Sequence, residues 1–319
     1  MRRCRYEKFE IPVGYYAGRA AISAFRWAYL LCISFIILYP LLYMLSLSLR
    51  SPADSLDVTT VWLPKHPTLE NYKSAILGVG LLEAMGNTAV ISVVTSALQI
   101  FSTCLAGYGF ARFRFRFRGI LFTLAVLSIM VPPQMLNMPN YLIFKNFDFF
   151  GLYQFMTGRP SPVSLIDSPL SYWLPAALGQ GLKTGLFILI FRQFFSGLPV
   201  ELEEAALIDG CGSLRTFFKI MLPNATVVML VFFLFSLVWY WGDYYTAFVN
   251  FSTVKTLSVR LVGMPQFLEV YLPREMQSVY YIVPINQAAC LFSITPLILL
   301  FIFCQKYFIR GIERTGIVG

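Results

Sequence analysis

A cluster of ionisable side chains stands between two apolar stretches in the second half of the chain. The segment Glu201–Pro223 reads ELEEAALIDGCGSLRTFFKIMLP and carries four acids and two bases within a few helical turns. Carboxylates at this density can form ion pairs with a basic surface. We therefore treat the segment as either a plain connection between two apolar stretches or an element that docks onto another molecule.

Other chemistry is sparse in this sequence. The single histidine, His66, stands between two prolines in a predicted loop, so histidine-based catalysis inside the apolar stretches is not expected. The six cysteines lie far apart without metal-ligand spacing, which predicts small apolar core residues and no metal site. The string GQGLKTG has the wrong spacing for a phosphate-binding loop. If the chain uses nucleotide energy, another subunit must bind the nucleotide.

The composition is that of a membrane protein. Hydrophobic residues make up 57% of the 319 residues, charged residues only 13%, and the mean hydropathy is +0.67. A soluble domain would carry about 25% charged residues. Apolar runs long enough to cross a bilayer of about 30 Å indicate an all-α integral membrane protein with about six transmembrane helices. These runs are Trp27–Leu49, Met85–Phe110, Ile120–Pro139, Trp173–Phe195, Asn224–Val249 and Ile282–Cys304.

The basic residues predict the orientation of these spans. Sixteen Lys and Arg residues fall on the side that holds both termini and eight on the other side, and basic residues are retained in the cytoplasm. We therefore expect an N-in, C-in topology with segment 201–223 in the cytoplasm. The loop ARFRFRFRG fits the same rule, so we expect no nucleic-acid binding. The outer segment Asn140–Tyr172 is predicted to be a loop or an excursion that contains a helix.

The pattern within the polar segment predicts two short helices on a glycine joint. Pro199 suits a first turn, the acids that follow it suit the positive end of a helix dipole, and Gly210 suits a helix end. A second helix is expected from an N-cap at Ser213 to Pro223. Its apolar face would consist of Leu214, Phe217, Phe218, Met221 and Leu222.

The same segment carries a resemblance to a known family. Glu204-Ala205-Ala206, three residues, Gly210, nine residues, and Ile220-x-Leu222-Pro223 match the E-A-A loop of permease subunits of bacterial ABC importers. The stretches YPLLYMLSLSL, AGYGFARFRF, MVPPQMLNMPNYLIF and PLILLFIFCQKYFIRGI resemble the carbohydrate-uptake branch, the family of the smaller membrane subunit of the maltose permease. The chain departs from many relatives at Gly242, in a longer outer loop, and in a tail that ends TGIVG.

The resemblance implies a division of the chain and a set of roles. It implies a cytoplasmic tail at 1–26, a six-span permease domain at 27–310 with a cytoplasmic helix-turn-helix coupling loop at 197–223, and a cytoplasmic tail at 311–319. In the family the loop sits in a cleft of the ATP-binding subunit, with Glu204 as the implied ion-pair residue and Gly210 as the turn. The implied coupling residues are Glu203, Glu204, Ala205, Ala206, Asp209, Gly210, Leu214, Phe217, Phe218, Ile220, Leu222 and Pro223.

Polar and aromatic residues inside the predicted spans are candidates for a substrate path. A charge at bilayer depth costs about 2.5–3.5 kcal/mol unless it faces protein or water, so Asp243 and Lys183 are expected to face the bundle interior. Sugars favour aromatic faces and hydrogen-bonding groups. The candidates are Gln180, Lys183, Trp239, Trp241, Asp243 and Tyr244; the alternative is an interfacial aromatic belt with a solvated Asp243 and a structurally paired Lys183.

The expected function is therefore that of a non-enzymatic permease subunit of a sugar or oligosaccharide importer in the bacterial cell membrane. The resemblance implies as partners two ATP-binding subunits, a second related permease subunit and an extracytoplasmic solute-binding protein, and the apolar runs imply the lipid bilayer. No cofactor is expected on this chain, since ATP and Mg would belong to the ATP-binding subunits. The alternatives are an ABC permease for a non-sugar solute, an ion-coupled secondary transporter and an intramembrane enzyme. The E-A-A pattern disfavours the secondary transporter, and the missing histidine and paired acids disfavour the enzyme.

Overall fold

The computed structural model describes residues 13–315, which form helices joined by short segments and contain no β-strand. The described part confirms the expected all-α class. The expected tails at 1–26 and 311–319 fall partly outside it. The α-helices are α1 (Val13–Ser48), α2 (Pro52–Leu56), α3 (Glu70–Val79), α4 (Leu81–Arg112), α5 (Arg118–Leu127), α6 (Pro133–Lys145), α7 (Leu152–Thr157), α8 (Leu170–Ala177), α9 (Thr184–Gly197), α10 (Glu201–Ile208), α11 (Ser213–Thr216), α12 (Leu222–Asn224), α13 (Thr226–Trp241), α14 (Tyr245–Asn250), α15 (Leu257–Val262), α16 (Met264–Tyr271) and α17 (Val279–Thr315).

Three helices of the described chain are long and apolar enough to cross a membrane without interruption. They are parts of α1, α4 and α17, and they coincide with the first, second and sixth predicted spans. Three further pairs of bent helices raise the number of candidate spans to as many as six. The described residues therefore contain between three and six candidate spans, and the predicted number of about six is the upper limit of this range.

The other three predicted spans are bent or interrupted in the structure. The helix that begins at Arg118 turns by 105° into α6 at Pro132 and Pro133, because a proline nitrogen cannot continue the hydrogen-bond ladder. The fourth predicted span is split into α8 and α9 by residues 178–183, where Gly179 and Lys183 have positive φ. The fifth ends at Trp241, before Gly242.

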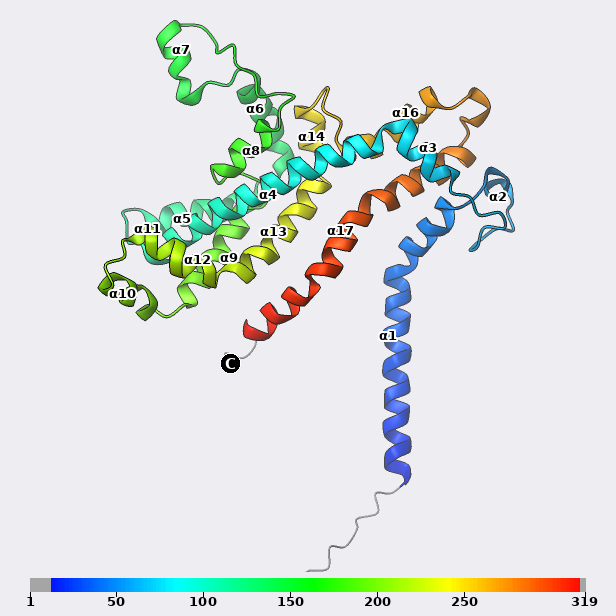
Figure 1. Cartoon of the computed structure of the whole chain (residues 1–319), viewed down its shortest axis with the longest axis horizontal. Helices are drawn as coiled ribbons and strands as arrows, with labels where there is room; N and C mark the ends of the chain where they lie inside the picture. The colour runs from blue at the N-terminus through cyan, green and yellow to red at the C-terminus, as the bar shows by residue number, and fades with distance from the viewer. Residues whose placement is uncertain (1–12, 316–319) are drawn as a thin grey trace, which may run out of the picture.

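Helix α4 runs through the middle of the molecule. It packs against α8 and α9 on one side and against α13 on another, while α17 lies beside α13 and contacts α1. Figure 1 shows α10, α11 and α12 at one end of this bundle and α2, α3 and α16 at the opposite end. Helix α1 stands away from the bundle for most of its length, and its side chains from Ile22 to Tyr39 are exposed. We call the first end the loop end and the second the opposite end.

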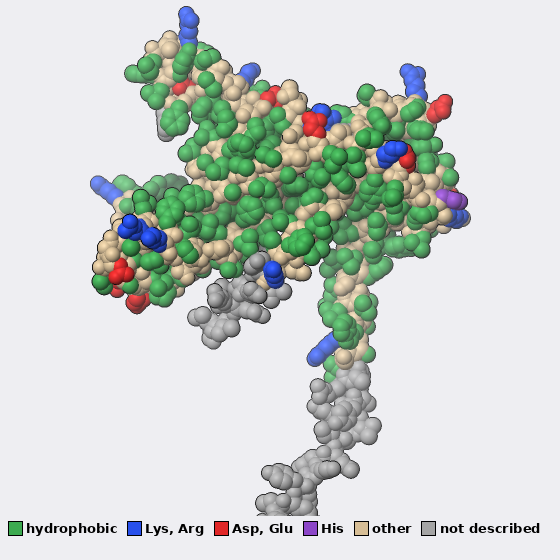
Figure 2. Space-filling view, in the orientation of Figure 1, with side chains coloured by type: hydrophobic (Ala, Val, Ile, Leu, Met, Phe, Trp, Pro, Cys, Tyr) green, Lys and Arg blue, Asp and Glu red, His purple; other side chains and the backbone are tan. Residues whose placement is uncertain are grey.

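Charged side chains gather at the two ends of the bundle. The space-filling view shows blue and red side chains over α10 and α11 and around α2, α3 and α16, with an apolar surface between them (Figure 2). Exposed Phe, Leu, Ile and Val side chains on α4, α5 and α17 form this surface. An apolar belt between two charged ends is the pattern of a protein that sits in a bilayer.

One buried side chain forms hydrogen bonds with the backbone of the break between α8 and α9. Gln99, in the middle of α4, is fully buried, and its Nε2 donates to the carbonyl of Leu182 at 2.6 Å. Its Oε1 accepts a hydrogen bond from Ser236 of α13 at 2.9 Å. The Leu182 N–H donates to the Tyr240 hydroxyl at 3.0 Å. Leu182 is half-buried, and both of its backbone groups are thus paired by side chains, as backbone groups shielded from water require.

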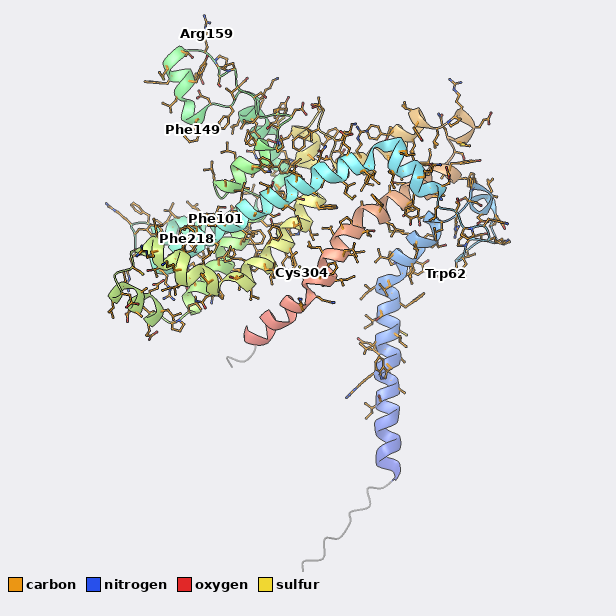
Figure 3. All side chains as sticks on the ribbon, in the orientation of Figure 1. Trp62, Phe101, Phe149, Arg159, Phe218 and Cys304 are labelled. Atoms are coloured by element: carbon orange, nitrogen blue, oxygen red, sulfur yellow. The ribbon has the colours of Figure 1, made fainter. Side chains whose placement is uncertain are left out.

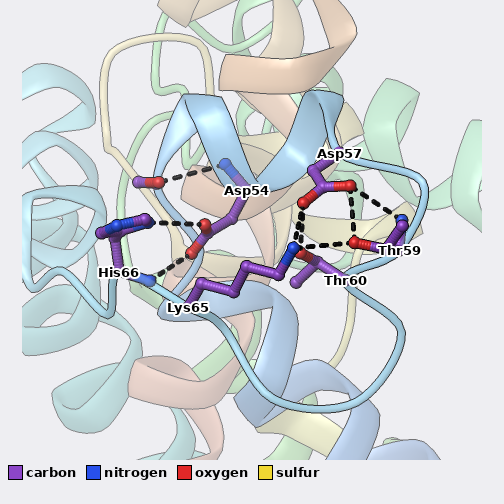
Figure 4. Close-up of polar contacts among 7 residues, drawn as sticks. Asp54, Asp57, Thr59, Thr60, Lys65 and His66 are labelled. Atoms are coloured by element: carbon purple, nitrogen blue, oxygen red, sulfur yellow. Dashed lines mark hydrogen bonds and ion pairs between the residues drawn. The ribbon is translucent and has the colours of Figure 1, made fainter.

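A network of polar side chains shapes the connection from α1 to α3. The Asp54 carboxylate is 2% exposed and accepts a hydrogen bond from the backbone N–H of His66 at 2.8 Å (Figure 4). The backbone N–H of Asp54 donates to the hydroxyl oxygen of Ser51, the N-cap of α2, at 3.1 Å. Asp57 forms an ion pair with Lys65 and accepts from the Thr59 N–H. His66 thus lies in a loop, as the sequence predicts, and its backbone N–H binds Asp54.

The long segment between α6 and α8 contains a helix, α7, as expected for an excursion. Two backbone hydrogen bonds hold its base, from Phe147 N–H to Val163 O and from Leu165 N–H to Phe144 O, each 2.8 Å long. The Asp148 carboxylate accepts from the first amides of α7. Figure 1 shows α7 extending away from the bundle beyond α6 and α8.

Gly107 permits a close approach of α9 to α4, and this can be tested. A Cβ at Gly107 would fall on the Cβ of Phe191 in α9 and lie 3.0 Å from the Arg192 nitrogen, whereas a Cβ at Gly109 meets nothing within 4 Å. We predict that Gly107→Ala lowers the free energy of unfolding by about 1–3 kcal/mol through overpacking. The matched Gly109→Ala should be neutral or stabilising by up to about 1 kcal/mol, since alanine favours helix. Equal effects on detergent-solubilised protein unfolding would contradict the assigned α4–α9 contact.

The ion pair of Asp57 predicts a pH dependence of the α1–α3 connection. The hydrogen bond from Lys65, followed by those from Thr59, lowers the pKa of Asp57 well below its usual range. A carboxyl with a depressed folded-state pKa stabilises the folded segment above about pH 4, and this contribution is lost as the pH falls toward the folded-state pKa. Amides near Thr59 should therefore exchange faster at pH 3 than at pH 6, after correction for intrinsic rates.

A pair of variants checks the origin of that effect. Asp57→Ala should show the faster exchange already at pH 6. Glu70→Ala removes a carboxylate whose pair with Lys73 is more than 60% exposed, so it should change little. The same protection in Asp57→Ala as in the wild type would show that the ion pair does not order this connection.

Candidate functional site

The segment with the E-A-A pattern lies across the loop end of the bundle. Helix α10 turns by 74° from α9, and the helix that ends at Asn224 turns by 75° into α13. The chain therefore leaves one span, runs crosswise and enters the next span at a steep angle. The expected pair of short helices on a glycine joint is present.

Helix α10 begins at Glu201, two residues later than Pro199 suggested, and three of its first four residues are acids. Acidic side chains at this position interact favourably with the positive end of the helix dipole. Gly210 ends the helix with φ +76°, and the Cys211 N–H closes on the Ala206 carbonyl at 2.9 Å. Glycine adopts this left-handed conformation without steric cost, so the sequence assigned the joint correctly.

The second half of the segment differs from its prediction. Gly212, not Ser213, is the N-cap of α11, and Ser213 makes no capping hydrogen bond. Residues Phe217–Met221 then form a π-helical turn. Because a π turn is wider than an α turn, the buried face shifts, so Leu214 is 70% exposed and does not support the segment as expected.

Two buried residues of the π turn anchor the segment to the bundle. Phe217 and Met221 are 1% and 0% exposed. The ring of Phe217 lies 5.1 Å from that of Tyr108 in α4, and Tyr108 lies 5.4 Å from Phe195 in α9. Phe218 is half exposed, but its ring stacks on Phe101 of α4 at 6.2 Å (Figure 3). The anchor thus connects the segment to both α4 and α9.

An ion pair provides a second attachment. Glu203 Oε1 lies 3.6 Å from Arg112 Nε at the end of α4, and the two side chains are 17% and 9% exposed. Arg112 also donates to the Leu198 carbonyl at 2.6 Å. Glu203 therefore faces the chain's own bundle. Sequence reasoning counted Arg112 only as a topological charge, because nothing in its spacing points to a partner about 90 residues away.

The remaining residues of the segment form an exposed surface around Gly210. Glu204 and Asp209 are exposed, and Leu207 and Ile208 are 60% and 86% exposed. Of the other residues with expected coupling roles, Ala206 is buried, Ala205 and Pro223 are exposed, and Ile220 and Leu222 are half-buried. We call Glu204, Leu207, Ile208, Asp209 and Leu214 the exposed rim.

The structure brings only two of the six substrate-path candidates into one cavity. Asp243 and Gln180 line a cavity of about 90 Å³ between α6, α8 and α13. Lys183 is exposed at the α8–α9 break, so it does not face the interior of this chain as expected.

The three aromatic candidates take structural positions. Trp241 is buried and donates to the Ser293 carbonyl of α17 at 3.1 Å. Trp239 packs on Phe187 at 5.6 Å, and Tyr244 stacks on Phe248 at 5.4 Å.

Sequence reasoning missed several residues around the cavity. Tyr172 donates its hydroxyl proton to Asp243 Oδ2 at 3.0 Å, and Tyr240 and Asn137 also line the cavity. Asn137 was not singled out from the sequence, because it lies within a predicted span and only the fold brings it to Asp243. Among the described residues, no group of three or more His, Cys, Asp or Glu side chains could hold a metal ion.

Curated relatives of this chain are membrane permeases. It is 28% identical over 290 residues to the arabinooligosaccharides transport system permease protein AraQ of Halalkalibacterium halodurans, covering 90% of this chain and 93% of that one. It is 28% identical over 298 residues to the maltodextrin transport system permease protein MdxG of Bacillus subtilis, covering 92% and 95%. It is 27% identical over 311 residues to the probable ABC transporter permease protein YurM of Bacillus subtilis, covering 96% and 90%.

A solved structure shares the fold. The crystal structure of a bacterial ABC transporter involved in the import of the acidic polysaccharide alginate contains a chain with a TM-score of 0.66 and 20% sequence identity, covering 96% of this chain and all of that chain. At this identity the likeness shows the fold alone. The family model described as binding-protein-dependent transport system inner membrane component matches residues 100–314, which include the whole E-A-A segment. The chain therefore belongs to the family of inner membrane components of binding-protein-dependent transport systems.

Proposed function

We propose that this chain is a permease subunit that forms part of the translocation path of an ATP-driven sugar or oligosaccharide importer, and that residues 197–223 couple it to an ATP-binding subunit. The observation that carries the coupling is the exposed rim. Glu204 has an exposed carboxylate beside the exposed Leu207 and Ile208, whereas the neighbouring Glu203 forms an ion pair with Arg112 of α4. An acid ringed by exposed apolar side chains suits a cleft that offers a basic group and an apolar floor.

The solute is proposed from the relatives. The names of two of them specify arabinooligosaccharides and maltodextrin. The second candidate is an ABC permease for a non-sugar solute, and it is favoured by a relative named as an osmoprotective compounds uptake permease, GgtD of Synechocystis, which is 28% identical over 289 residues.

The partners follow from the family. We propose a second, related permease subunit, two ATP-binding subunits that hold ATP and Mg, and an extracytoplasmic solute-binding protein. In this proposal the chain forms part of the transport path and catalyses no reaction itself. The loop end of the bundle faces the cytoplasm in this proposal, as the distribution of basic residues favours.

The attachment of the segment supports a lever mechanism. Phe217 and Met221 are locked among aromatic side chains of α4 and α9, and Glu203 is tied to the end of α4. A packed aromatic cluster resists deformation, so displacement of α10 moves α4 and α9 with it. ATP-driven closure of the partner subunits would thus rock the spans between two states as rigid bodies.

Glu204 provides the direct test of coupling. We predict that Glu204→Lys lowers solute-stimulated ATP hydrolysis and uptake by the assembled importer at least about tenfold, because it places a like charge against a basic group. The thermal stability of the permease should not change, since Glu204 is exposed. Glu70→Lys makes the same charge change on an exposed residue at the opposite end and should leave activity unaltered. Wild-type activity in Glu204→Lys would refute the coupling role.

Glu203→Ala tests whether Glu203 holds the E-A-A segment to the chain's own bundle, in contrast to the proposed docking role of Glu204. It leaves Arg112 without its ion-pair partner in a site that is 9% exposed, so we predict a lower unfolding midpoint of the permease, which Glu204→Ala should not show. Equal stability losses in the two variants would contradict the different environments assigned to these glutamates.

Reporter fusions test the proposed orientation. Alkaline phosphatase fused after residue 66 or residue 160 should be active, because both positions are placed outside the cytoplasm. A fluorescent protein that folds only in the cytoplasm should fluoresce when fused after residue 210. Inactive phosphatase at 66 and 160 would reverse the topology.

A further inference from the structure

A cavity with several polar side chains in its wall lies beside the break between α8 and α9. Its volume is about 90 Å³, several times the roughly 10–15 Å³ that one water molecule needs. Amide and carboxyl side chains from α6, from the break and from the segment after α13 reach its wall. They belong to Asn137, Asn140, Gln180 and Asp243. Such a concentration of hydrogen-bonding groups, three amides and one carboxyl, within an apolar bundle points to a polar occupant.

Asp243 is the only charged side chain of the lining. Its Oδ2 accepts a hydrogen bond from the Tyr172 hydroxyl at 3.0 Å, and its Oδ1 accepts from the Thr246 N–H at 3.2 Å. A carboxylate offers about four acceptor positions, so these two bonds leave others for a ligand. Since the lining includes no Lys, Arg or His, an acidic group that entered the cavity would meet a carboxyl and no compensating base.

Aromatic side chains close the inner wall. Tyr172 and Tyr240 are 6% and 7% exposed, and their rings lie 6.0 Å apart. Gly181 brings the break against this wall, because a Cβ there would lie 2.9 Å from Gln99 Nε2 and still closer to the Tyr240 hydroxyl. The wall is therefore held by the same contacts that repair the break. Aromatic rings beside hydroxyl and amide groups give this wall both apolar and polar parts, as the surface of a sugar has.

We propose that this cavity is a solute-contact site within this chain, and that it accepts neutral, hydroxyl-rich solutes and rejects acidic ones. The proposal rests on the proposed import of a sugar and assigns part of the selectivity to this subunit. Hydroxyl groups of the solute donate to Asp243, and the amides of Asn137, Asn140 and Gln180 both donate and accept. An acidic sugar would lose its hydration without gaining a cationic partner.

The experiment measures weak binding to the complete complex. The importer, with both permease subunits and its ATP-binding subunits but without the solute-binding protein, is placed in lipid nanodiscs. Saturation-transfer NMR titrations then compare arabinotriose, maltotriose and trimannuronate, which are two neutral trisaccharides and one acidic trisaccharide. At least one neutral sugar should bind the wild type, and the acidic sugar should bind at least about tenfold more weakly.

Variants assign the preference to this cavity. Asp243→Asn should reduce the preference for the neutral sugar at least about threefold, and Asn140→Lys should favour trimannuronate. Glu269→Gln makes the same charge change as Asp243→Asn on an exposed side chain outside the lining, so it should keep the wild-type preference. Thermal unfolding of each complex confirms that the variants are folded.

Several results would overturn the proposal. They are the absence of binding by both neutral sugars, equal or tighter binding of trimannuronate to the wild type, and an unchanged preference in both folded variants. ATP-driven uptake into proteoliposomes is measured in parallel with the solute-binding protein. If the wild-type importer takes up none of the sugars, the importer function is refuted. If the wild type takes up sugar but Asp243→Asn and Asn140→Lys keep its preference for neutral over acidic sugar, only the assignment of this site is refuted.

Discussion

The requirement that every backbone polar group be paired in an apolar environment governs this fold. The fourth predicted span breaks over residues 178–183, and the freed carbonyl and N–H of Leu182 are taken up by Gln99 and Tyr240. These two side chains come from α4 and α13, so the repair also fixes three helices against one another. Without these two hydrogen bonds, the half-buried Leu182 would have two backbone groups without a protein partner, which costs free energy wherever water does not reach them.

Helix α4 owes its central position to small as well as polar residues. Gly107 lets α9 approach its backbone, and Ser102 donates to the Ala176 carbonyl at the end of α8. Farther along, Tyr108 contacts Phe217 of the E-A-A segment, and Arg112 pairs with Glu203. One helix therefore carries the contacts to the broken span and to the segment at the loop end, and the two regions share a single rigid support.

The sequence predicted what depends on local chemistry and missed what depends on distant partners. The length of the apolar runs predicted α1, α4 and α17, because a membrane span requires only a long enough apolar stretch. Gly210 predicted the joint between the two short helices, because glycine adopts a left-handed turn without steric cost. The π turn at Phe217–Met221 was not predictable, since it arises where packing overrides the 3.6-residue period. Asp243 and Gln180 were identified by polarity alone, but Tyr172 and Asn137 join them only after the folding of separate segments.

Tyr240 contacts both the cavity and the residue just before α9, so it lies between the two regions that have proposed roles in transport. Its ring forms a wall of the cavity, and its hydroxyl accepts the Leu182 N–H just before α9 begins. The other end of α9 carries Phe195, which packs through Tyr108 against Phe217 of the E-A-A segment. Since a helix transmits displacement along its axis more readily than it bends, a movement of the segment would shift the start of α9 against Tyr240. Helix α9 thus connects the cavity wall to the E-A-A segment.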